Sequence, residues 1–99
     1  MIQGFLELIS HLRVRGWAYD ADRPQTFLTI EICCNGALLG STVANLYRND
    51  LEVAGVGTGN HAFILNLDNG LSEADFPHTS AFGLDQVGTK IKLCLVSPG

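Results

Sequence analysis

The feature that most constrains the fold is an alternation of apolar and polar residues that runs from Phe27 to Cys34 and stops at Asn35-Gly36. Alternation with a period of two is the pattern of a strand with one buried face. Asn-Gly between two apolar stretches is the strongest short hairpin signal, because both central residues of a type I′ turn have positive φ. The sequence therefore predicts an antiparallel hairpin over Phe27–Ala44, with Gly40 marking a bulge in the return strand.

Further stretches with a period of two predict additional strands, separated by clusters of turn-forming residues. No stretch shows the longer period of an amphipathic helix of useful length. Six to eight short strands with frequent turns predict an all-β fold, an antiparallel β-sandwich of the Ig-like or jelly-roll-like kind. The predicted strands cover residues 5–9, 12–19, 27–34, 37–44, 61–67, 81–84 and 90–96.

The apolar faces of these strands supply a core large enough for one domain. Hydrophobic residues make up 46% of the 99 residues and charged residues only 16%, so we expect a single β-sandwich over residues 1–99. The closing Ser-Pro-Gly resembles a linker and favours a module excised from a longer protein. The predicted core residues are Leu28, Ile30, Ile32, Phe63, Leu65, Ile91, Leu93 and Leu95.

The segment from Tyr47 to Gly59 interrupts the strand pattern and predicts an irregular crossover. Glycine recurs at every second position, at Gly55, Gly57 and Gly59, which favours a tight connection. The spacing lacks the pattern and the Lys-Ser/Thr pair of a phosphate-binding loop. We therefore expect a structural crossover with at most a short helical turn within residues 47–55.

Arg48 and Asp50 form a charged pair near the start of this crossover. In the structural interpretation, Asp50 accepts hydrogen bonds from backbone amides near Glu52 or Val53, as a capping residue does at a helix start. Arg48 then ties the crossover to a neighbouring strand. In the alternative interpretation, the pair is a clamp for a ligand.

A row of arginine and aromatic residues is the main candidate for ligand binding. Arg13, Arg15, Trp17 and Tyr19 occupy alternate positions, so strand geometry places all four on one exposed face. Aromatic faces stack on sugar rings and guanidinium groups bridge hydroxyl or carboxylate groups, so the row would suit a carbohydrate. The alternative is that Gly16 marks a bulge, which would shift the register and place Trp17, the single tryptophan, in the core.

Catalytic and metal-binding patterns are weak in this sequence. His11, His61 and His78 are far apart without metal-ligand spacing, and the sequence has no nucleophile elbow. Asp20 and Asp22 lie in a predicted turn and could contribute to a calcium site, although the EF-hand pattern is missing. We therefore expect no enzymatic activity, no cofactor and no bound metal.

The three cysteines favour reduced thiols. Cys33 and Cys34 are adjacent, so they point to opposite faces of a strand and are poor partners for each other. A bridge from one of them to Cys94 across a sheet is the alternative. The odd count and the apolar surroundings favour three free thiols packed as small hydrophobic residues.

The formal net charge of −4 and the absence of a long apolar run argue against two classes of partner. An acidic chain is not attracted to the nucleic-acid backbone, and no run approaches the roughly 20 apolar residues of a membrane span. The N-terminus lacks the basic and apolar regions of a signal peptide. We expect a cytoplasmic protein or a part of a larger exported one.

Three short motifs within residues 5–67 resemble a known type of module. They are Gly16-Trp17-Ala18, Arg48-x-Asp50-Leu51 and Gly59-x-His61-x-Phe63, in this order. The pattern is similar to a small β-sandwich accessory module of bacterial multidomain proteins, often attached to glycosyltransferase or cell-surface regions. The resemblance implies an accessory domain without a catalytic role.

These observations favour a non-catalytic binding or interaction module for a carbohydrate or a cell-surface polymer. Its expected partners are a glycan or neighbouring domains of the same chain. The alternative is a purely structural spacer, or a self-assembly domain that forms a homo-oligomer through a sheet edge.

Overall fold

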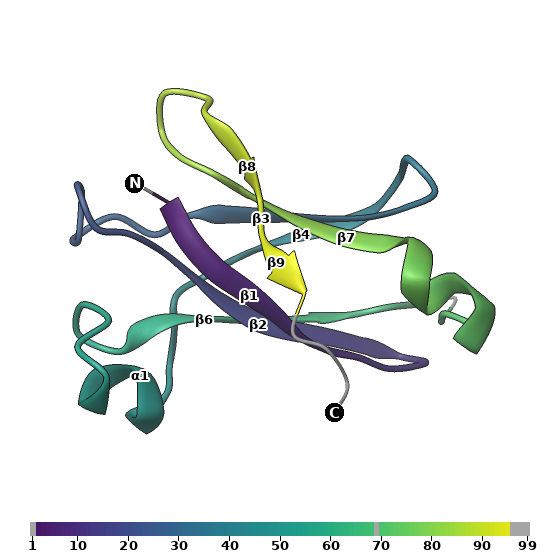
Figure 1. The fold of residues 1–99 in the computed structure, drawn as a ribbon, viewed down its shortest axis with the longest axis horizontal. Helices are drawn as coiled ribbons and strands as arrows, with labels where there is room; N and C mark the ends of the chain where they lie inside the picture. The colour runs from purple at the N-terminus through teal and green to yellow at the C-terminus, as the bar shows by residue number, and fades with distance from the viewer. Residues whose placement is uncertain (1, 69, 96–99) are drawn as a thin grey trace.

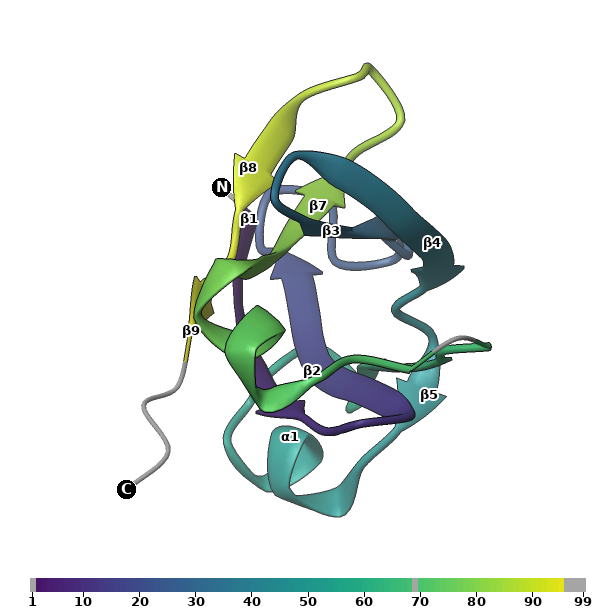
Figure 2. The same ribbon diagram turned by 90° about the vertical axis from the view of Figure 1, so that its right-hand side faces the viewer.

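The computed structural model describes residues 2–68 and 70–95, which fold into two facing β-sheets (Figures 1 and 2). Sheet A has the strand order β5-β6-β2-β1-β9, and sheet B has the order β4-β3-β7-β8. The predicted all-β sandwich is confirmed, with nine strands in the described part of the chain where six to eight were expected. The elements are β1 (Ile2–Ile9), β2 (Arg13–Asp20), β3 (Thr29–Cys34), β4 (Ala37–Val43), β5 (Leu46–Tyr47), α1 (Asn49–Val53), β6 (Asn60–Asn66), a 3₁₀ helix (Glu73–His78), β7 (Thr79–Leu84), β8 (Lys90–Lys92) and β9 (Cys94–Leu95).

The predicted hairpin is formed by β3 and β4, which pair in antiparallel register around Asn35-Gly36. The φ angles of Asn35 and Gly36 are 51° and 79°, which is the left-handed backbone that a type I′ turn requires. The register shifts once, because Ile32 pairs with Gly40 while the next residue of β3 pairs with Leu38. The extra residue in the return strand is therefore Leu39, directly beside Gly40, where the bulge was predicted.

The chain changes sheets between β8 and β9. After β8 has paired with β7 in sheet B, the Leu93 backbone N–H donates to the Ala81 carbonyl at 2.8 Å. β9 then joins sheet A next to β1, and this one pairing is parallel in an otherwise antiparallel sandwich. The predicted continuous strand over residues 90–96 is therefore two short strands, and Val96 lies outside the described residues.

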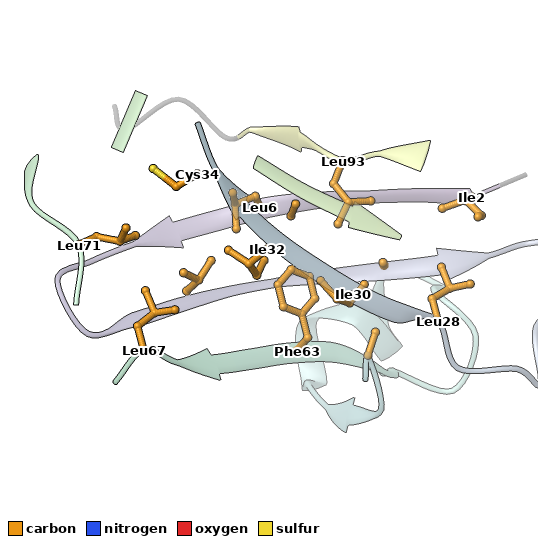
Figure 3. Close-up of a cluster of buried hydrophobic side chains, with 14 residues drawn as sticks. Ile2, Leu6, Leu28, Ile30, Ile32, Cys34, Phe63, Leu67, Leu71 and Leu93 are labelled. Atoms are coloured by element: carbon orange, nitrogen blue, oxygen red, sulfur yellow. The ribbon is translucent and has the colours of Figure 1, made fainter. Parts of the chain in front are cut away.

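The core lies between the two sheets (Figure 3). Leu65 is half-buried and packs against it, and the Leu65 side chain lies under the backbone of Gly40 on β4. The Leu95 side chain is outside the described part of the structure. The predicted core residues that are buried are Leu28, Ile30, Ile32, Phe63 and Leu93.

The prediction that Ile91 is buried is wrong, because 41% of this residue is exposed. Ile91 lies on β8, the edge strand of sheet B, and the hairpin formed by β7 and β8 projects away from the sandwich (Figure 1). Strand alternation describes which residues share a face, but it does not show whether an opposing sheet covers that face.

The three cysteines are free thiols in different surroundings. Cys34 is buried and Cys33 is half-buried, as expected for small hydrophobic residues in a central strand. Cys94 is exposed, so the expectation that all three thiols are packed is wrong for this residue. The cause is its position on β9, which has only two residues and forms an edge of sheet A.

Candidate functional site

The outer face of sheet A carries the row Arg13, Arg15, Trp17 and Tyr19, which we call the β2 row. β2 pairs with β6 in unbroken register through Gly16, and the irregularity beside β1 lies in β1 itself, after Leu6. The alternative in which a bulge at Gly16 places Trp17 in the core is therefore wrong. The four residues are exposed or half-buried, whereas the intervening residues of β2 are buried.

Gly16 is required by close packing rather than by a bulge. A Cβ atom at this position would lie 2.0 Å from the Phe5 carbonyl oxygen and 2.8 Å from Cζ of Phe63. Both distances are far below van der Waals contact, so β2 accepts no side chain here without displacing the backbone of β1. The glycine allows the Phe63 ring to lie directly against the inner side of the β2 row.

The two aromatic rings of the β2 row are half-buried and supported by neighbouring rings. The Trp17 ring packs on Phe5 of β1, with centroids 5.6 Å apart and planes tilted by 51°. The Tyr19 ring packs on His61 of β6, with centroids 4.6 Å apart and planes tilted by 57°. These contacts hold the rings in fixed positions while part of each remains accessible to solvent.

The two arginines of the row differ in how they are held. Arg13 Nε donates a hydrogen bond to Oδ1 of Asn66 on β6, at 3.1 Å, which orients its guanidinium group along the sheet. Arg15 is exposed beside Ile64, its partner in β6, and its guanidinium group has no partner within the described part of the chain. Arg15 thus offers its full set of donors to a ligand.

An open hollow of about 490 Å³ adjoins the Arg13 end of the β2 row. It is lined by Ser10, Leu12, Arg13, Asn66 and Leu67, which combine an exposed apolar side chain with hydroxyl, amide and guanidinium groups. A shallow, mixed surface of this kind fits an elongated ligand better than a small molecule enclosed in a cavity.

Arg48 ties the crossover to the outer face of sheet A. Its guanidinium group forms an ion pair with the Glu7 carboxylate of β1 through both terminal nitrogens, and a second one with Asp50 at 2.6 Å. Both hydrogen-bonded carboxylates raise the pKa of Arg48 above its ordinary value, while Arg48 lowers the pKa of Asp50. Arg48 directly follows β5, and Glu7 lies in β1. The strands β6 and β2 lie between β5 and β1, so the ion pair spans both intervening strands.

The ion pairs hold α1 on the side of sheet A that faces away from sheet B (Figures 1 and 2). Leu51 of α1 and Ala62 of β6 are both 3% exposed, yet neither belongs to the main core between the sheets. Their burial shows that α1 and its neighbours cover a separate, smaller apolar area on the outer face.

The amides of Glu52 and Val53, which were predicted to bind Asp50, are not its partners; the Arg48 guanidinium group lowers the pKa of Asp50 most, and the backbone N–H groups of Asp50 and Leu51 lower it further. The helix begins on Arg48, whose carbonyl oxygen accepts the N–H groups of Leu51 and Glu52 at 3.2 and 3.3 Å, and no side chain caps it. Asp50 lies within the first turn instead, where its carboxylate is bound by the Arg48 guanidinium group. The short helical turn expected within residues 47–55 is α1.

Replacing Arg48 with alanine is expected to lower the free energy of unfolding by about 1–3 kcal/mol, since it leaves Glu7 half-buried and unpaired. Asp50→Asn should have a smaller effect, because the Asp50 side chain is mostly exposed. Chemical denaturation of both variants measures the change in the free energy of unfolding. Equal stability of Arg48→Ala and the unmodified protein would contradict a structural role for the ion pair.

The glycine-rich part of the crossover folds back over His61. Gly55, Gly57 and Gly59 all have positive φ, at 80°, 53° and 87°. A Cβ atom on Gly57 would lie 2.5 Å from His61 Nε2 and 3.0 Å from the Tyr19 ring, so both the backbone angle and the packing require glycine there.

His61 was considered from the sequence as a candidate metal ligand and as part of the Gly59-x-His61-x-Phe63 motif, but the surroundings of its side chain were not predicted. It is 1% exposed, and neither ring nitrogen has a hydrogen-bond partner within the described residues. Its ring packs against those of Tyr19 and Phe27. Burial disfavours the charged imidazolium and lowers the pKa of His61 below 6.5.

The stability of the fold is therefore expected to decrease as the pH falls below about 6.5, the ordinary pKa of histidine. Below that value the unfolded chain binds a proton at His61 that the folded chain excludes, so acid favours unfolding. The neighbouring Tyr19 and Phe27 rings are uncharged in this range. Chemical denaturation at pH values between about 7 and 5 measures the decrease.

His61→Leu should remove this part of the pH dependence, and His78→Ala, which changes an exposed histidine, should retain it. An unchanged pH profile in His61→Leu would show that His61 does not couple protonation to folding.

The structure gives no support to a metal centre. Within residues 2–68 and 70–95, no three His, Cys, Asp or Glu side chains come together as a metal site. Asp20 is buried, and its carboxylate accepts the Asp22 backbone N–H at 3.1 Å, which gives the pair of turn aspartates a local structural role. Among the described residues, none of the helices has the length and hydrophobicity needed to cross a membrane.

Comparisons with known proteins give no relative from which a role could be transferred. No protein-family model matches the chain, and neither a curated protein nor a solved structure matches it.

Proposed function

We propose that this chain is a non-catalytic binding module that recognises a carbohydrate or a carbohydrate-containing cell-surface polymer through the β2 row. The observation that carries the proposal is the common outward orientation of Arg13, Arg15, Trp17 and Tyr19 on a rigid central strand. Binding residues on a strand are held more firmly than residues on loops, so they lose little conformational freedom when a ligand binds.

The chemistry of the row supports a sugar ligand. The accessible part of the Trp17 ring can stack on the apolar face of a sugar, and Phe5 supports it from β1. Arg15 can donate paired hydrogen bonds to hydroxyl or carboxylate groups, and Arg13 borders the adjoining hollow. The resemblance to accessory modules of bacterial glycosyltransferase and cell-surface proteins supports the same class of ligand.

A purely structural domain is the second candidate. It is favoured by the packing of Trp17 on Phe5 and of Tyr19 on His61, which gives both rings a role in stability without any ligand. In this case the outer face of sheet A would contact a neighbouring domain of a larger protein.

A glycan array probed with the purified protein and with Arg15→Ala separates the two candidates. Loss of a charged hydrogen-bond donor is worth about 1.5–3 kcal/mol, so Arg15→Ala should bind at least about tenfold more weakly. Arg23→Ala is the matched control, because it removes another exposed positive charge that lies outside the β2 row. The proposal would be contradicted if the protein bound no glycan on the array, or if the unmodified protein and Arg15→Ala bound equally well.

A further inference from the structure

Three of the six basic side chains of this protein have carboxylates close to them. Arg48 is bound by two carboxylates, and Lys90 forms an ion pair with Glu31 at 3.0 Å. Arg23 borders a hollow of about 620 Å³ whose lining includes three aspartates. The acidic groups that give the protein its net charge of −4 therefore compensate these three positive charges locally.

Arg13 and Arg15 of the β2 row have no such compensation, and we call them the arginine pair. Arg13 Nε donates to the neutral amide of Asn66, which leaves its charge and both terminal nitrogens available. Arg15 has no side-chain partner within the described residues. Residues two apart on one face of a strand are separated by about 7 Å, so the pair forms a local positive patch on an otherwise acidic protein.

The strands that flank the arginine pair bring no unbound carboxylate to it. β6 contains no acidic residue, and β1 contains only Glu7, whose carboxylate is bound by Arg48. Asp68 follows β6 in a turn and forms no ion pair with Arg13 within the described residues. The hollow beside Arg13 has no acidic residue in its lining. The residues paired with the row are Asn66, Ile64 and Ala62 of β6 and Leu8, Phe5 and Gln3 of β1, and none of them is charged.

We infer that the β2 row binds an acidic polysaccharide in which sugars that carry a carboxylate alternate with uncharged sugars. The inference rests on the proposed function of the row and adds the chemical class of the ligand. A carboxylate accepts paired hydrogen bonds from the planar guanidinium group of arginine. The arginine pair would bind the carboxylates, while Trp17 stacks on an uncharged sugar farther along β2. The row from Arg13 to Tyr19 extends over about 20 Å, which suits several consecutive units of a linear polymer.

Charge density favours a polysaccharide over a nucleic acid, the other polymer that combines negative charge with flat rings. A nucleic-acid backbone carries a charge at every nucleotide, and proteins that bind single strands line a groove with positive charge. The β2 row offers two positive charges, and the net charge of −4 would repel the remaining phosphates. A polymer with carboxylates only on alternate sugars matches a row that is charged at one end and aromatic at the other.

Titration calorimetry of the unmodified protein with matched polymers tests the inference. Hyaluronan and heparosan both alternate glucuronate with N-acetylglucosamine, and reduction of their carboxylates to alcohols gives the neutral controls. At least one acidic polymer should bind at least about tenfold more tightly than its reduced form, because a charged hydrogen bond is lost on reduction. This preference should decrease as the ionic strength is raised from about 0.05 to 0.5 M.

Arg13→Gln and Arg15→Gln should each weaken the preference for the acidic polymer, since glutamine keeps a hydrogen-bond donor but removes the charge. Arg23→Gln is the matched control and should retain the preference, because it removes an exposed positive charge outside the row. The comparison of acidic with reduced polymer uses the unmodified protein, so it stays valid even if a variant does not fold.

The outcomes separate this inference from the proposed function. Equal binding of acidic and reduced polymers overturns the inference and leaves recognition of carbohydrate standing. Binding of neither polymer in either form also overturns it, and the glycan array then decides separately whether the row recognises a neutral glycan. A preference that survives in both glutamine variants, or single-stranded DNA that binds as tightly as the acidic polymers, overturns the inference as well.

Discussion

Replacing Phe63 with alanine is expected to lower the free energy of unfolding by about 3–5 kcal/mol, which is the usual range for a large core aromatic residue. Phe63 is completely buried, and its ring extends from β6 toward Ile30 and Ile32 of the opposite sheet (Figure 3). Removing the Phe63 ring would leave a cavity beside Gly16, which has no side chain to fill it. Chemical denaturation measures the loss.

Ile64→Ala is the matched control, because the neighbouring side chain points outward and is 39% exposed. Its expected loss is below about 1 kcal/mol, since little buried area is removed. If Phe63→Ala were as mild as Ile64→Ala, the assignment of the two faces of β6 would be reversed.

Gly16→Ala is expected to cost about 3 kcal/mol, the upper part of the range for overpacked cores. The added methyl group would collide with the backbone of β1 at the Phe5 carbonyl oxygen, and backbone atoms yield less readily than the end of a flexible side chain. The strands β1 and β2 would have to separate, which would also displace the Trp17 ring from Phe5.

Gly83→Ala provides the comparison for this substitution. Gly83 is a buried strand glycine as well, but the contacts of its added methyl group would begin at 3.4 Å and involve only side chains. We expect a change of less than about 1 kcal/mol, because the space accepts the group and alanine restricts the unfolded chain. Similar losses for Gly16→Ala and Gly83→Ala would contradict the steric conflict with β1 that is expected at Gly16.

Local patterns predicted the hairpin and most of the strands, because these depend on neighbours in the sequence, but they missed β5 and joined β8 and β9 into one strand. The turn at Asn35-Gly36 requires only the positive φ of two adjacent residues, and the alternation of β2 requires only its own period. The change of sheet at Leu93 depends on the Ala81 carbonyl, which is distant in the sequence. Alternation therefore predicted Ile91 as buried, although 41% of this residue is exposed.

The candidate site was predicted in part for the same reason. The common face of the β2 row follows from alternation, while the contact of Arg48 with Glu7 joins residues on opposite sides of two other strands. His61 has no hydrogen-bond partner among the described residues, and this is also a tertiary property, because Gly57 closes over the ring. The main partner of Asp50, the Arg48 guanidinium group, was not predicted, since an acidic residue at a helix start can bind backbone amides, a nearby arginine or both.

The emission of Trp17 tests the proposed binding face most directly, because this is the single tryptophan of the chain. Titration with the glycans retained on an array, and with neutral and acidic polysaccharides, should produce a saturable change in its fluorescence. The change should require at least about tenfold more ligand in Arg15→Ala and should be unaltered in Arg23→Ala. Emission that stays constant with every glycan, or a saturable change of equal affinity in Arg15→Ala, would contradict recognition of carbohydrate by the β2 row.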